Sequence, residues 1–327
     1  MSAIDPPTFA DVQDAAARLK GVAVRTPLLH VEALNEAANG RVFVKAECLQ
    51  RTGTFKFRGA YNRVSRLTDD ERRRGVVAFS SGNHAQGVAA AAKMAGCAAT
   101  IVMPADAPAL KIARTRGYGA EVVLYDRFNE NREAIASKIA SETGAVVVPP
   151  FDDPYVIAGQ GTVGLEIAEQ LLETGATADV LICPASGGGL MAGVALAFET
   201  LSPKTALYCA EPAGFDDHAL SLKAGERVSL TPTTASLCDA LMSPSPGAVT
   251  FPINQPRLAG AVDASDEEVL AAMAFAFEHL KLVIEPGGAA ALAALLAGRI
   301  ALNGRTAVIV ASGGNVDPAT FVRALTA

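Results

Sequence analysis

Short apolar segments that alternate with longer helical segments constrain the fold of this chain most strongly. Four such apolar runs open the series, at residues 75–79, 99–103, 121–125 and 145–148. Three more follow after residue 150, at 179–183, 206–210 and 306–310. Strands separated by helices are typical of parallel sheets whose two faces are covered. We therefore predict an α/β protein.

Length and composition agree with this class. The chain has 327 residues and is 50% hydrophobic, which suffices for two domains with buried strands. We predict a small domain at 75–150, inserted into a large domain formed by 1–74 and 151–327. Residues 151–161 are expected to form a connection before a helix at 162–173.

Charge and cysteine content exclude several classes of function. The net charge is −6, and the one short basic run, Arg72 to Arg74, is typical of a solvated helix end. The five cysteines are scattered without metal-binding spacing, which favours reduced core residues. The first residues lack the pattern of a secretory leader, and no apolar run is long enough to span a bilayer. We expect a cytoplasmic protein that binds neither nucleic acid nor membranes.

The segment 52–60 places one lysine, Lys56, between Phe55 and Phe57. Thr52 or Thr54 can cap a helix, and Lys56 then lies in its first turn. The helix dipole and the aromatic rings both disfavour a charged amine there, so its pKa should fall. A lysine of this kind can form a Schiff base, although a surface lysine with a packed stem is the alternative.

Three consecutive glycines follow Ser186, between an apolar strand and an apolar helix. Their backbone amides can converge on one point at the helix N-terminus, which suits a phosphate group. The spacing matches neither the dinucleotide fingerprint nor the nucleoside-triphosphate loop. A tight strand–helix turn is the alternative, but it does not require three glycines.

Two further loops end strands in the same way, at 80–84 and 312–315. Ligands bind at the carboxyl ends of the strands in open α/β sheets. The first loop offers hydroxyl and amide groups for a carboxylate and a ring oxygen, and its His84 is either a structural hydrogen bonder or a base. Ser312 can bond a neutral pyridine nitrogen. Together with Lys56 and a phosphate site, these groups specify pyridoxal 5′-phosphate (PLP).

The chain resembles the serine/threonine dehydratases and serine racemases, which are PLP enzymes of fold type II, similar to tryptophan synthase β. The resemblance covers nearly the whole chain and is carried by residues 54–60, 80–87, 158–162, 186–190, 284–286 and 312–315. It implies two open, twisted, mainly parallel sheets flanked by helices, with the cofactor in the cleft between two domains. It also implies a homodimer.

The resemblance implies roles for individual residues. Lys56 would carry the cofactor and act as a base, and Ser81 would lie on the opposite face of the substrate, which leaves racemisation open. The implied cofactor-binding residues are Phe55, Lys56, Asn83, Gly187, Gly188, Gly189, Leu190 and Ser312. The implied substrate-binding residues are Ser80, Ser81, Asn83, His84, Arg132 and Ser243.

A divalent cation site is also implied by the resemblance. Glu211, the Phe215 carbonyl and Asp217 would bind Mg²⁺ or Ca²⁺ through oxygen ligands. A solvated acidic turn is the alternative.

The chain departs from the family pattern at Asp239-Ala240, where relatives commonly have Asp-Gly, and over residues 241–247. These departures leave the substrate and nucleotide activation open. Because the sequence ends at Ala327, soon after the last loop, we do not expect the C-terminal regulatory domain of biosynthetic threonine dehydratases.

The resemblance implies an ammonia-lyase that dehydrates a β-hydroxy amino acid. L-Threonine and L-serine are the default substrates. 3-Hydroxyaspartate is the alternative if Arg132 pairs with a second carboxylate. A racemase, a β-replacing synthase and a non-catalytic PLP-binding sensor are the competing interpretations. The residues around Lys56 favour a dehydratase over a synthase, and the presence of Lys56, Ser81 and Ser312 together counts against a sensor.

Overall fold

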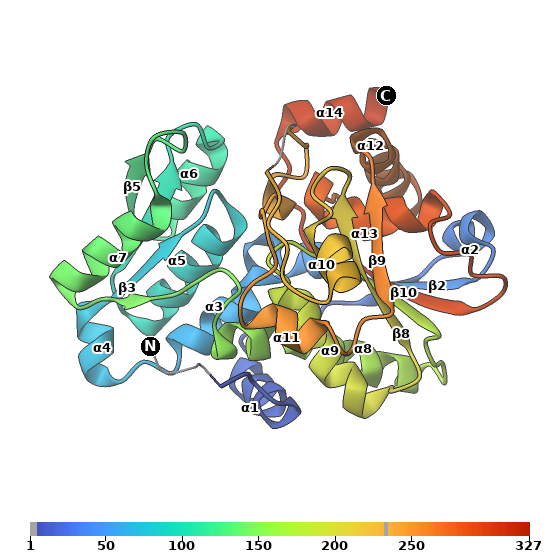
Figure 1. Cartoon of the computed structure of the whole chain (residues 1–327), viewed down its shortest axis with the longest axis horizontal. Coiled ribbons are helices and arrows are strands. Elements are labelled where there is room, and N and C mark those ends of the chain that lie inside the picture. The colour runs from blue at the N-terminus through green and yellow to red at the C-terminus, as the bar shows by residue number, and fades with distance from the viewer. Residues whose placement is uncertain (1–4, 232–234) are drawn as a thin grey trace.

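The computed structural model describes residues 5–231 and 235–327 as two helix-flanked sheets (Figure 1). Residues 1–4 and 232–234, which belong to the predicted large domain, lie outside the described ranges. Figure 1 shows the smaller sheet with helices α4 to α7 on the left and the larger sheet with its helices on the right. Within the described ranges, no helix is both long and apolar enough to cross a lipid bilayer.

The smaller sheet has the strand order β5-β4-β3-β6, and all of its strands are parallel. Its strands are β3 (Val76–Phe79), β4 (Ala99–Pro104), β5 (Glu121–Tyr125) and β6 (Val146–Val147). Its helices are α5 (Asn83–Ala95), α6 (Ala109–Gly117) and α7 (Arg132–Thr143). The predicted parallel sheet within 75–150 is therefore confirmed.

The larger sheet has the strand order β1-β2-β10-β7-β8-β9. Only β1 runs antiparallel to its neighbour. Its strands are β1 (Leu28–His30), β2 (Arg41–Lys45), β7 (Val180–Pro184), β8 (Ala206–Pro212), β9 (Gly260–Ala264) and β10 (Thr306–Val310). The central strand β7 is buried throughout, as expected for a parallel strand with helices on both faces of the sheet.

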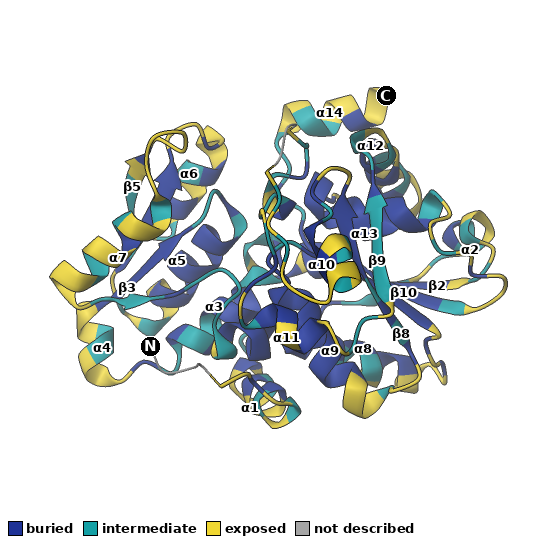
Figure 2. Cartoon of the chain, viewed as in Figure 1, coloured by how far each residue is buried: buried dark blue, intermediate teal, exposed yellow. Residues whose placement is uncertain are grey.

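Helices of different lengths surround the larger sheet. They are α1 (Phe9–Leu19), α2 (Glu32–Ala38), α8 (Pro154–Glu173), α9 (Gly189–Leu201), α10 (Asp217–Ala224), α11 (Thr250–Asn254), α12 (Asp266–Phe275), α13 (Pro286–Leu296) and α14 (Pro318–Thr326). The apolar pattern over 266–280 predicts one amphipathic helix, and the structure forms this stretch as α12 followed by a π-helical turn at Ala276–Leu280. Figure 2 shows α9 and α13 largely buried, whereas α4 and α7 expose much of their surface.

The predicted connection at 151–161 is wrong for most of its length, because α8 begins at Pro154. Asp153 caps this helix by accepting a hydrogen bond from the Val156 amide, and Pro154 suits the first helical position. The glycines of this segment allow close helix packing. A Cβ atom at Gly159 would lie 2.6 Å from the Gly59 Cα on α3 (Lys56–Val64).

The sequence from Lys56 to Arg74 predicts one helix that residues 69–74 close, but the structure has two helices there. α3 stops at Val64, and a separate helix α4 (Asp69–Arg74) follows. Thr68 and Glu71 form a reciprocal capping box that starts α4 anew.

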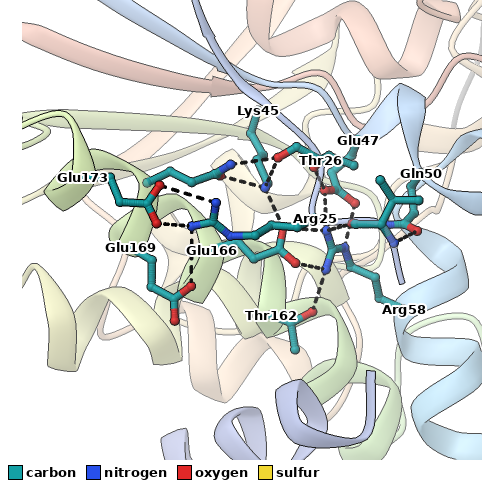
Figure 3. A network of polar contacts seen from close by, with 12 residues as sticks. Arg25, Thr26, Lys45, Glu47, Gln50, Arg58, Thr162, Glu166, Glu169 and Glu173 are labelled. Atoms are coloured by element: carbon teal, nitrogen blue, oxygen red, sulfur yellow. Dashed lines mark hydrogen bonds and ion pairs between the residues drawn. The ribbon is translucent and has the colours of Figure 1, made fainter. Parts of the chain in front are cut away.

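A buried network of charges fixes α3 against the larger sheet and α8 (Figure 3). Arg58 pairs with Glu47 at 2.8 Å and with Glu166 at 2.7 Å. Lys45 pairs with Glu166 at 2.6 Å, so two cations face two anions. Burial alone would raise the pKa of Glu47, but the Arg58 guanidinium holds it below its usual value. This network therefore ties the start of α3 to β2 and α8.

Candidate active site

A cavity lies between the two sheets, where the carboxyl ends of several strands meet. Every residue predicted to bind cofactor or substrate lines this one cavity. They are Phe55, Lys56, Ser80, Ser81, Asn83, His84, Arg132, Gly187, Gly188, Gly189, Leu190, Ser243 and Ser312. Segments more than 250 residues apart in the chain thus form a single site.

Lys56 is the first residue of α3, and it lines the cavity. Nζ donates a hydrogen bond to the Pro150 carbonyl at 2.8 Å and lies 5.2 Å from the centre of the Phe55 ring. Burial lowers the pKa of this amine to about 8. Of the two flanking rings, the Phe55 ring is the one that lies over the amine. The Phe57 side chain is fully buried in the protein core. The alternative of an ordinary surface lysine does not fit this environment.

The start of α3 is held beside Ser312. Thr54 forms an isolated antiparallel bridge with Gly313, and the Phe55 amide donates to the Ser312 carbonyl at 3.2 Å. Phe55 occupies the N-cap position of α3 and forms no side-chain cap, so neither predicted threonine stands at that position; the Thr54 hydroxyl accepts from the Lys56 amide at 3.3 Å. The lysine amine and the Ser312 hydroxyl therefore reach the cavity from two paired backbone segments.

The glycine loop after β7 turns its carbonyl groups away from the cavity. The Ser186 carbonyl accepts from His218 Nε2 at 2.7 Å, and the Gly188 carbonyl accepts from Asn254 Nδ2 at 3.2 Å. The Gly187 carbonyl accepts from the Thr250 hydroxyl. In a trans peptide unit the N–H points opposite to the C=O. The amides of residues 187–189 therefore point to the other side, where these glycines line the cavity.

No side chain fits at these three glycines. A Cβ atom would lie 2.4 Å from the Phe151 ring at Gly187 and 2.9 Å from Phe151 Cβ at Gly189. At Gly188 it would lie 2.8 Å from His218 and Asn254, and the backbone φ of +86° also favours glycine. The loop leads directly into the N-terminus of α9, which adds positive potential. The loop has the geometry of a phosphate cradle, and this close packing explains why three glycines are needed.

The loop at 80–84 joins β3 to α5 on the opposite side of the cavity. Asn83 donates to Glu285 Oε1 at 2.6 Å and accepts from Asn315 at 3.0 Å. His84 Nε2 donates to the Val148 carbonyl at 2.8 Å. Burial, assisted by the nearby Lys56 charge, lowers the pKa of His84 to about 3. His84 is therefore a neutral side chain that holds the loop to the smaller sheet, which supports its structural interpretation.

Two acidic residues and a lysine of the cavity were not among the predicted site residues. Lys111 on α6 pairs with Asp239 at 2.7 Å, which connects the two halves of the molecule across the cavity. Burial raises the pKa of Glu285 to about 7. Glu285 directly precedes α13, but its approach to Asn83 depends on residues 202 positions apart.

Arg132 on α7 and Ser243, which follows the turn at Asp239–Leu241, both line the cavity. The Arg132 guanidinium lies 5.5 Å from the centre of the Phe79 ring. In the part of the chain that the structure describes, no carboxylate lies within ion-pair distance of it. The Ser243 amide donates to the Ser186 hydroxyl at 3.3 Å, so Ser243 is tied to the glycine loop.

The predicted cation ligands lie outside the cavity, where β8 ends and α10 begins. Oxygen atoms of Glu211 and Asp217 and a ring nitrogen of His218 lie within 4.8 Å of one another. All three residues are buried, and neither carboxylate oxygen of Asp217 has a hydrogen-bond partner among the described residues. Burial raises the pKa of Asp217 to about 7 and that of Glu211 well above its usual value.

Two buried carboxylates of this kind need either protons or a cation, and their oxygen atoms suit Mg²⁺ or Ca²⁺. Phe215, the third predicted ligand, lies between them in the chain with its side chain buried. His218 was missed, because its sequence neighbours carry no metal-binding spacing. The solvated acidic turn considered as the alternative is inconsistent with this burial.

Comparison with known protein families identifies the family of this chain. Residues 19–313 match the family described as "Pyridoxal-phosphate dependent enzyme". The chain belongs to this family. The cavity brings together a lysine amine, a cradle of backbone amides and a serine hydroxyl, and these groups fit the aldehyde, the phosphate and the ring nitrogen of PLP.

Individual relatives agree with this assignment. The chain is 43% identical to the L-threo-3-hydroxyaspartate ammonia-lyase of Saccharomyces cerevisiae, over 95% of this chain and 94% of that protein. It is 42% identical to the L-threonine ammonia-lyase of Thermotoga maritima, over 95% of this chain and 76% of that protein. The structure of maize serine racemase is 37% identical, matches with a TM-score of 0.92 and covers 98% of both chains. The predicted fold type II architecture is confirmed.

Proposed function

We propose that this protein is a PLP-dependent ammonia-lyase that dehydrates a β-hydroxy amino acid to an oxo acid and ammonia. The observation that carries the proposal is the Lys56 amine, whose pKa is lowered to about 8 and which faces the same cavity as the glycine cradle and the loop at 80–84. Relatives named as ammonia-lyases support this reaction class.

Different side chains of the cavity have different roles in this reaction. Lys56 Nζ, partly in its amine form near neutral pH, takes up the proton from the substrate α-carbon. The loop at 80–84 and the N-terminus of α5 bind the α-carboxylate. Bound PLP supplies an electron sink for charge at the α-carbon. The Ser312 hydroxyl would donate a hydrogen bond to the pyridine nitrogen of PLP without protonating it, which would favour elimination over transamination.

We infer that the preferred substrate is L-threo-3-hydroxyaspartate, with L-threonine and L-serine as poorer substrates. Arg132 reaches the cavity without a carboxylate partner in the described ranges, and its guanidinium can pair with the second carboxylate of this substrate. The methyl group of threonine would leave the guanidinium without that partner. Two relatives, from Saccharomyces cerevisiae and Pseudomonas, are named for this substrate.

Steady-state kinetics with the three amino acids test the proposal. We expect ammonia and oxo acid from each, with kcat/KM for L-threo-3-hydroxyaspartate at least about tenfold above the others. Lys56→Ala should abolish turnover, whereas Lys138→Ala, at an exposed lysine of α7, should not change it. Absence of ammonia release by the wild-type protein with all three substrates would disprove the proposal.

We also propose that Glu211, Asp217 and the Phe215 carbonyl bind a divalent cation. The two carboxylates are buried, and Asp217 lacks hydrogen-bond partners within the described ranges. Calorimetric titration of the EDTA-treated protein with Mg²⁺ and Ca²⁺ tests this site, and Asp217→Asn should abolish the heat of binding. The predicted homodimer stays a prediction that light scattering can test.

A further inference from the structure

His218 connects the cation site to the phosphate cradle. Its backbone amide donates to Glu211 Oε1 at 2.8 Å, and its ring donates from Nε2 to the Ser186 carbonyl at 2.7 Å. Nε2 carries the hydrogen, because a carbonyl can only accept. The side chain is fully buried, so both contacts are shielded from water. One residue therefore contacts a predicted cation ligand and the first carbonyl of the glycine loop.

Three side chains support the carbonyls of this loop, but only one of them reaches the cation site. Thr250 and Asn254 both belong to α11, and they hold the carbonyls of Gly187 and Gly188. His218 belongs to α10 and lies against both the acidic pair and the loop. A Cβ atom at Gly188 would be 2.8 Å from its Cε1 atom, so the ring has little room to move without moving the loop.

A bound cation would act on this set of contacts through the two carboxylates of Glu211 and Asp217. Glu211 uses both carboxylate oxygens as acceptors, from the amides of His218 and Ala219. Asp217, the neighbour of His218 in the chain, has two buried oxygens without partners in the described part of the molecule. A cation between the two carboxylates would fix their positions, and with them the backbone of residues 217–219. The His218 ring would then be held against the Ser186 carbonyl.

We propose that His218 couples the cation site to the phosphate cradle, so that a bound divalent cation strengthens PLP binding. The inference depends on the proposed cation site and adds a positioning residue to it. Because coupling between two binding sites is reciprocal, PLP should strengthen cation binding by the same factor. We expect a factor of roughly 5 to 20, within the range of ordinary coupling energies.

Equilibrium dialysis of the full-length holoenzyme against graded PLP concentrations measures this coupling. The visible absorption of protein-bound PLP reports occupancy in EDTA and in saturating Mg²⁺. We expect the dissociation constant of PLP for the wild type to fall about 5- to 20-fold with Mg²⁺. His218→Phe keeps a ring but loses the donor, so its PLP affinity should not respond to Mg²⁺. His218→Gln retains an N–H donor on a side chain of similar reach and should restore part of the response.

Thr250→Val is the matched control. It removes the support of the Gly187 carbonyl without touching the cation site, so it should weaken PLP binding equally with and without Mg²⁺. Circular dichroism checks that each variant is folded. If the phenylalanine variant does not fold, His218→Asn replaces it, because its shorter side chain cannot reach Ser186.

The outcomes separate this inference from the proposals on which it depends. Calorimetry that detects no Mg²⁺ binding to the wild type would disprove the cation site together with the coupling. Mg²⁺ binding without any change in PLP affinity would disprove the coupling alone and leave the lyase and the cation site intact. A His218→Phe variant that keeps the full Mg²⁺ response would show that the coupling does not pass through this residue.

Discussion

At the scale of single residues, the environment of Lys56 decides its chemistry. Burial moves its pKa from the usual 10.5 to about 8, so the amine form becomes dominant above pH 8. The rate at which cofactor-free protein captures PLP should therefore rise about tenfold per pH unit below pH 8 and level off above it. Stopped-flow absorption measures this rate. A rate that continues to rise to pH 10 would indicate an ordinary lysine.

Arg132 is the residue from which the substrate preference is argued. Replacing it with leucine removes the partner of the second carboxylate, and a lost charged hydrogen bond costs about 1.5–3 kcal/mol. We expect kcat/KM for L-threo-3-hydroxyaspartate to fall roughly 10- to 150-fold, whereas that for L-serine stays within about twofold. Arg127→Leu, at an arginine that pairs with Asp106 on the surface, is the matched control. Equal losses for both substrates would contradict the proposed role.

At the scale of elements, the glycine loop depends on backbone geometry and on the side chains behind it. Gly188→Ala would place Cβ 2.8 Å from His218 and Asn254 at a φ of +86°. We expect PLP affinity to fall more than tenfold, because the loop must shift to relieve this contact. Gly175→Ala has a similar φ of +64° but open space around Cβ, so it should leave PLP affinity unchanged. Dialysis with absorption detection measures both variants.

The helix that carries Lys56 depends on the buried charges of Figure 3. Arg58→Met would leave Glu47 and part of Glu166 without their partner inside the protein. Breaking a buried pair in this way costs about 3–5 kcal/mol of unfolding free energy. Arg25→Met breaks a half-exposed pair with Glu173 and should cost less than about 1 kcal/mol. Urea unfolding followed by circular dichroism compares the two, and equal losses would contradict this assignment.

At the scale of the whole molecule, the site exists because two sheets meet. Lys56, the glycine cradle and Ser312 come from the larger sheet and its helices, whereas the loop at 80–84 and Arg132 come from the smaller one. Polar contacts such as Lys111–Asp239 and Asn83–Glu285 join the two halves beside the cavity. Each half supplies only part of the chemistry, so the relative position of the sheets matters for turnover.

The sequence by itself determined the strand and helix rhythm, the glycine loops and the special position of Lys56. These features depend on residues close together in the chain, because strand periodicity, the backbone flexibility of glycine and helix N-termini are local properties. The prediction of a connection at 151–161 was wrong, because α8 begins at Pro154 and its Gly159 packs closely against α3. The sequence also failed to find Glu285, Lys111 and His218 as site residues.

Only the tertiary structure shows that Glu285, Lys111 and His218 belong to the sites. His218 contacts Ser186 across 32 positions, and Asn83 contacts Glu285 across 202. Such contacts depend on how both sheets and their helices pack, which no local pattern specifies. The burial that lowers the pKa of Lys56 and raises that of Asp217 has the same origin. The sequence predicts which chemical groups form the site. Their protonation states and their long-range hydrogen bonds depend on the tertiary packing, because that packing buries the groups away from water.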